Sequence, residues 1–66
     1  MEQIERIHDS LVSGQRRQMV EQIDEYGLYD FFSDYSDYLD MLYSDVDGMY
    51  SYFKDAVVSY HRIKNQ

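Results

Sequence analysis

The sequence predicts an all-α protein, a small bundle of three or four helices that forms a single domain over residues 1–66. Apolar residues recur every three or four positions through most of the chain, as on one face of a helix. Glycine follows the first two such segments, at Gly14 and Gly27, where a left-handed residue commonly ends a helix. Proline is absent, and the aspartates of residues 28–43 recur at three and four positions, whereas a strand would repeat every two.

The first two segments predict a helical hairpin with a very tight joint at Gly14. In residues 2–13 the apolar stripe consists of Ile4, Ile7, Leu11 and Val12. In residues 15–26 it consists of Met19, Val20, Ile23 and Tyr26. Gly14 could instead lie inside one longer helix, at a cost of about 1 kcal/mol relative to alanine.

Residues 28–63 carry a longer apolar seam, whose spacing alternates between four and three as in a heptad repeat. The part of this seam that we predict as a self-association surface consists of Leu28, Phe32, Tyr35, Leu39, Leu42, Val46, Met49 and Phe53. Ala56, Tyr60 and Ile63 continue it. We expect the seam to pack inward or onto a second copy of the chain.

Two structures are compatible with this seam. One is a single long helix over about residues 29–63, which the unbroken periodicity favours. The other is a pair of helices meeting near residues 44–48, or one kinked helix, which Gly48 beside two aspartates favours. Ser44 could cap the second helix, with Asp45 and Asp47 placed well for its dipole. We predict two helices or one kinked helix.

The small size of the chain favours self-association. A domain of this size buries only about 60% of the surface that its unfolded chain exposes. Disulfides are excluded because cysteine is absent, and two histidines, His8 and His61, argue against a structural zinc. Oligomerisation is the remaining common reinforcement. We therefore expect a homodimer.

The distribution of charge is the strongest indication of function. The formal net charge is −7, and between Gln18 and Phe53 the chain has nine acidic residues, seven of its eight tyrosines and neither lysine nor arginine. Such a surface steers toward cationic partners and repels phosphate. We therefore predict binding to a protein with a basic surface and no direct binding to nucleic acid.

On a helical wheel the aspartates of the third segment gather opposite the seam. The predicted protein-binding face consists of Asp30, Asp34, Asp37, Asp40 and Asp45, with Tyr29. Like charges at these spacings destabilise a helix by a few tenths of a kcal/mol per pair, and no cation here offsets them. We expect Tyr35 and Tyr60 in the core, and Tyr29, Tyr50 and Tyr52 at the surface, where tyrosine is typical of binding sites.

Two kinds of partner fit this face: a protein whose groove normally holds DNA or RNA, or any other basic protein surface. Asp30 to Asp40 span roughly 15 Å of helix. Duplex DNA carries one charge per about 1.7 Å, so one copy imitates its charge poorly. The alternative function is a self-assembling helical module whose acidity serves only solubility.

The other chemical motifs are weak, and we predict no enzyme, no cofactor and no metal site. Asp45–Gly48 resembles part of a calcium loop, but its first and twelfth ligand positions hold Tyr43 and Lys54. His8, Asp9 and Ser10 are adjacent on a helix and cannot form a catalytic triad. The pair Arg16–Arg17 is expected to answer Glu21 or another acid.

No apolar run reaches the ~20 residues of a membrane span, and the acidic N-terminus is unlike a signal peptide. With no cysteine in the chain either, we expect no membrane association and a cytoplasmic location.

Three stretches, Gly14–Met19, Glu25–Phe31 and Tyr52–Ala56, resemble small acidic accessory proteins from the early regions of lambda-like tailed bacteriophages. The resemblance covers most of the chain, although these stretches are not diagnostic motifs. It implies a short helical early protein in the host cytoplasm that acts by binding a host protein, and it identifies no functional residues.

Overall fold

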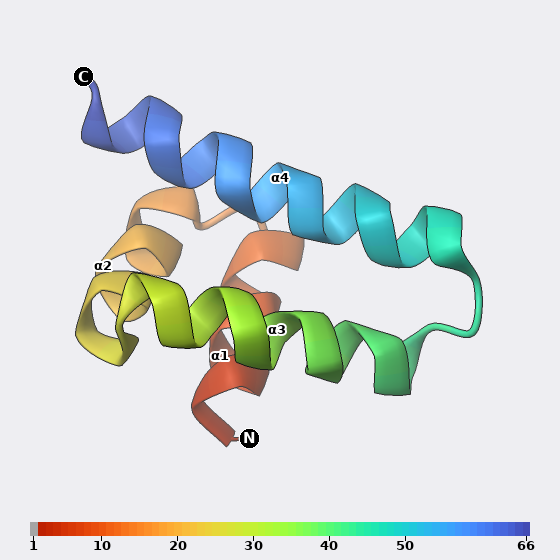
Figure 1. Cartoon of the computed structure of the whole chain (residues 1–66). Coiled ribbons are helices and arrows are strands. Elements are labelled where there is room, and N and C mark those ends of the chain that lie inside the picture. The colour runs from red at the N-terminus through yellow and green to blue at the C-terminus, as the bar shows by residue number, and fades with distance from the viewer. Residues whose placement is uncertain (1) are drawn as a thin grey trace.

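A computed structural model describes residues 2–66 and confirms the all-α bundle. The helices are α1 (Glu2–Val12), α2 (Arg16–Tyr26), α3 (Leu28–Leu42) and α4 (Val46–Lys64). Figure 1 shows α3 and α4 side by side, running in opposite directions and joined by a short loop at one end, while α1 crosses α3. The helix α2 contacts all three others.

Two glycines end the first two helices as predicted. Gly14 has φ 82° and Gly27 has φ 106°, in the left-handed region that side chains disfavour. The Gly27 N–H donates to the Ile23 carbonyl at 2.8 Å, and the Gly27 carbonyl accepts from the Phe31 N–H at 2.8 Å. One glycine therefore closes α2 and opens α3.

The C-terminal segment is two helices, so the alternative of one long helix is wrong. The chain leaves the helical conformation at residues 43–45 and reverses direction there. Asp45 is the N-cap of α4, because its carboxylate accepts from the backbone N–H groups of Asp47 at 2.9 Å and Gly48 at 3.3 Å. The predicted cap, Ser44, lies one residue too early. Residues 46–54 are helical, which leaves no calcium loop there.

This reversal folds the seam back on itself within one chain. Tyr35, Leu39, Ala56 and Tyr60 are buried, and Leu28, Phe32, Met49, Phe53 and Ile63 are partly buried against the core. Only the members nearest the turn are well exposed: Leu42 at 50% and Val46 at 72%. Most of the predicted self-association surface is therefore occupied by contacts inside the chain.

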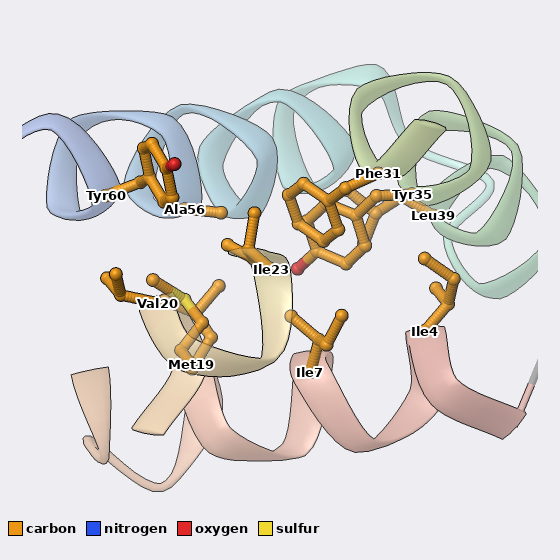
Figure 2. Close-up of a cluster of buried hydrophobic side chains, with 11 residues drawn as sticks. Ile4, Ile7, Met19, Val20, Ile23, Phe31, Tyr35, Leu39, Ala56 and Tyr60 are labelled. Carbon is orange, nitrogen blue, oxygen red and sulfur yellow. The ribbon is translucent and has the colours of Figure 1, made fainter. Parts of the chain in front are cut away.

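The core lies where all four helices meet. Its buried apolar members are Ile4, Ile7, Leu11, Met19, Val20, Ile23, Phe31, Tyr35, Leu39, Ala56 and Tyr60. Figure 2 shows Ile7 pointing toward the rings of Phe31 and Tyr35, and Ile23 pointing toward Ala56. The Phe31 and Tyr35 rings stack with their centroids 4.8 Å apart.

Polar contacts hold α4 against α2. The Arg16 guanidinium contacts Asp55 Oδ2 and Ser59 Oγ, each at 3.1 Å, so its acidic partner is Asp55 and not Glu21. At the other end of α2, Asp24 accepts from the Tyr60 hydroxyl at 2.5 Å and from Lys64 Nζ at 2.8 Å.

We predict that Asp45→Ala lowers the free energy of unfolding by about 1 kcal/mol, because two N–H groups of α4 lose their acceptor. Ser44→Ala should stay within about 0.5 kcal/mol of wild type. Urea denaturation of both variants measures the difference. A larger loss for Ser44→Ala would contradict the assignment of the cap.

Candidate functional site

Four of the predicted binding residues are exposed on the outer side of α3. Asp30, Asp37 and Asp40 are exposed, and Tyr29 is 86% exposed beside them. The ion pairs formed among residues 2–66 are Arg6–Glu2, Arg16–Asp55 and Lys64–Asp24, and none involves these aspartates. We call Tyr29, Asp30, Asp37 and Asp40 the acidic face.

The two other predicted aspartates have structural roles. Asp34 is half-buried and accepts a hydrogen bond from the Tyr26 hydroxyl of α2, which raises the pKa of Tyr26. Asp45 is held by its capping contacts at the start of α4. Sequence spacing placed both on the predicted protein-binding face, because it shows which side of a helix a residue lies on. It does not show that a neighbouring helix supplies a donor.

Met41 belongs to the same side of the helix as the acidic face. It lies one turn beyond Asp37 and follows Asp40 directly, and its side chain is 77% exposed. An exposed methionine offers a soft apolar contact among the carboxylates.

Every lysine and arginine lies outside α3, and three of them share one hollow. Arg16, Lys54 and Arg62 line a shallow hollow between the start of α2 and the outer side of α4, together with Asp55. The helix α3 contains no basic residue. The charge of the molecule is therefore segregated, with an uncompensated negative side along α3.

A small apolar groove lies between α3 and α4, and sequence analysis did not predict it. Its volume is about 200 Å³, and it is lined by Ser36, Leu39, Val46, Met49, Tyr50 and Phe53. Leu39 and Phe53 were assigned to the seam, but the groove exists only because α4 folds back beside α3. Tyr50 is exposed as expected, and it stands at the edge of this groove.

A buried histidine surrounded by tyrosines is the second feature that sequence analysis missed. His8 is only 6% exposed; its Nδ1 lies 2.7 Å from the Tyr35 hydroxyl, and its Nε2 lies 3.4 Å from that of Tyr43. The rings of Tyr38 and Tyr52 also pack against the imidazole. The available signal was the position of His8 one turn after Ile4, on the apolar face of α1.

Burial governs the titration of this cluster. Burial lowers the pKa of His8, and the nearby Asp9 carboxylate opposes that shift. Burial also raises the pKa of Tyr35. The folded chain therefore favours a neutral imidazole held between two neutral phenols.

The tyrosines divide almost as predicted. Tyr35 and Tyr60 are in the core, and Tyr29 and Tyr50 are exposed, which confirms those assignments. Tyr52 is half-buried, because its ring stacks on Tyr43 with centroids 5.0 Å apart. The loop residue Tyr43 thus covers a ring that periodicity alone placed in solvent.

Across residues 2–66, no cluster of three or more His, Asp or Glu side chains could hold a metal ion. His61 is exposed on α4, whereas His8 is enclosed. Within the same residues, no helix has both the length and the apolarity needed to cross a membrane. Comparisons with protein-family models, curated proteins and solved structures find no match to this chain.

We predict that acid destabilises the fold through His8. The unfolded histidine has a pKa near 6.5, and its folded pKa is lower, so the stabilisation is present above pH 6.5 and is lost as pH falls through the folded pKa. His8→Asn should flatten the dependence of unfolding free energy on pH between about 7.5 and about 5.5, a range in which ordinary carboxylates stay ionised.

His61→Asn is the matched control and should keep the slope of the wild-type chain. Urea denaturation at a series of pH values gives both slopes. If the free energy of unfolding fell equally with pH in wild type and His8→Asn, another group would cause the acid sensitivity.

Proposed function

We propose that this chain is a non-enzymatic protein-binding adaptor or inhibitor whose acidic face docks on a basic surface of another protein. The observation that carries the proposal is the exposure of Asp30, Asp37 and Asp40 without an ion-pair partner in residues 2–66.

The acidic face is costly for the helix that bears it. Asp37 and Asp40, and likewise Asp37 and Asp34, stand three residues apart, so their carboxylates repel one another by a few tenths of a kcal/mol per pair. Aspartate is also a weaker helix former than glutamate. An external cationic surface would remove this repulsion, which supports a binding role over a purely structural one.

Tyr29 supports the same proposal. A large aromatic side chain that is 86% exposed beside carboxylates provides contact area at a low entropic cost. Charge on the rim of an interface mainly accelerates association and selects partners. The acidic face would therefore supply steering and specificity, and Tyr29 would supply contact.

The proposed partner is a protein, which includes proteins that bind nucleic acid through a basic groove. Asp34 is hydrogen-bonded to Tyr26, so three exposed carboxylates remain along about 15 Å of α3. They are those of Asp30, Asp37 and Asp40. This spacing is far sparser than the charge of duplex DNA, about one per 1.7 Å. The proposal therefore requires a basic surface and does not require imitation of DNA.

The resemblance to early phage accessory proteins adds to this proposal a cellular location and a source of the partner. The chain would act in the host cytoplasm, and the partner would be a host protein. The acidic face fits such a role, since proteins that bind nucleic acid carry basic surfaces.

The homodimer expected from the sequence stays a prediction. The exposed remainder of the seam, Leu42 and Val46, is the surface that it would use. Each copy brings a formal charge of −7, so mutual repulsion opposes pairing. The same negative charge attracts a cationic partner, which favours the adaptor over the self-assembling module.

We predict that neutralising the acidic face weakens partner binding roughly tenfold, since exposed ion pairs contribute about 0.2–1 kcal/mol each. The variant is Asp30→Asn, Asp37→Asn and Asp40→Asn. The matched control is Glu5→Gln, Glu21→Gln and Glu25→Gln, which removes the same charge from exposed positions of α1 and α2.

Capture from a bacterial lysate, followed by mass spectrometry and titration of the captured protein, measures both effects. Binding should fade between about 0.05 and about 0.5 M salt because the contacts are exposed charges. Equal affinity of the two variants, or the absence of any captured protein at low salt, would contradict the proposal.

A further inference from the structure

We propose that the groove between α3 and α4 receives an apolar anchor side chain from a basic amphipathic helix of the partner. This inference rests on the proposed function and adds to it the shape of the partner. It requires the acidic face to bind a cationic protein and the groove to bind one apolar side chain of that protein.

The groove is lined by both buried and exposed side chains. Leu39 is fully buried at one side, and Met49 and Phe53 are partly buried. Val46 and Tyr50 are 72% and 62% exposed at its edge. These side chains give an apolar surface that a partner can desolvate, and methionine adapts readily to the shape of a ligand.

The size of the groove indicates what it can hold. Sites for small molecules usually measure about 300–1,000 Å³. A groove of about 200 Å³ is smaller, and it suits one large side chain of the kind that anchors a protein interface.

Carboxylates stand on both sides of the groove. Asp40 lies one turn beyond Ser36 on α3, and Asp47 lies one turn before Tyr50 on α4; both are exposed. Lys54, one turn beyond Tyr50, ends the negative rim. A ligand with one apolar side chain flanked by cations matches this arrangement.

This pattern selects a basic amphipathic helix as the occupant. Such helices insert apolar anchors spaced by three or four residues into a groove while their charged residues meet its rim. A second copy of the chain would bring carboxylates to carboxylates. Charge complementarity therefore favours the cationic helix over self-association.

The methionines provide separate probes for the two surfaces. Met49 lines the groove, Met41 lies on the side of the acidic face, and Met19 is fully buried in the core. With ¹³C-labelled methionine methyl groups, the signals of Met41, Met49 and Met19 distinguish groove binding, charge binding and a change of the whole fold.

The test is a titration with two synthetic helices of about 15 residues that carry the same lysines. One presents leucine at a single anchor position, and the other presents alanine there. We expect the leucine helix to shift both Met41 and Met49, to leave Met19 unchanged, and to bind about tenfold more tightly than the alanine helix.

Each other outcome decides between the two proposals. A shift of Met41 alone, with equal affinity for both helices, would overturn the groove inference and leave the proposed function intact. No shift at low salt would overturn both. A Met49 shift that follows protein concentration without peptide would assign the groove to a second copy and overturn the inference.

A pair of variants completes the test. Val46→Ser with Tyr50→Ser should weaken the leucine helix about tenfold and leave the alanine helix unchanged. The control, Val12→Ser with Val58→Ser, removes two exposed apolar side chains that do not line the groove, and it should bind as wild type. Equal losses of affinity for the leucine helix in both double variants would contradict the assignment of the groove as the anchor site.

Discussion

The buried hydroxyl of Tyr35 constrains the rest of the structure. Tyr35 is fully buried, and a buried hydroxyl without a partner costs about 1–3 kcal/mol. His8 Nδ1 of α1 satisfies this hydroxyl at 2.7 Å, while the Tyr35 ring stacks on Phe31 and lies 6.2 Å from the Phe53 ring of α4. One side chain thus joins α1, α3 and α4. With this side of α3 fixed inward, Asp30 and Asp37 face solvent.

Periodicity predicted the helices and their inner faces, but it could not identify what those faces contact. Gly14 and Gly27 were recognisable as helix ends because glycine tolerates the positive φ that the backbone commonly adopts just after a helix. The seam was recognisable too, yet an apolar stripe is the same whether its partner is another molecule or the next helix. The three-residue turn before Val46 decides this, and Asp45, rather than Ser44, stabilises it. The bond from Tyr26 to Asp34 depends on the same tertiary packing.

The positive charges of the chain explain why α3 can stay uncompensated. Arg16 and Lys64 are used to hold α4 against α2, through Asp55 and Asp24. Both cations are satisfied by these pairs, and no ion pair among residues 2–66 involves Asp30, Asp37 or Asp40. Asp24 and Asp55 therefore stabilise the fold through ion pairs, whereas the aspartates of the acidic face form none within residues 2–66. The apolar groove lies beside one of these, Asp40.

Carboxyl-group footprinting of the chain with and without its captured partner tests the central claim most directly, because it reports each aspartate and glutamate separately. We predict that labelling of Asp30, Asp37 and Asp40 falls in the complex while that of Glu5 and Glu21 stays constant. Unchanged labelling of the three aspartates, with protection of the α1 and α2 glutamates instead, would contradict it.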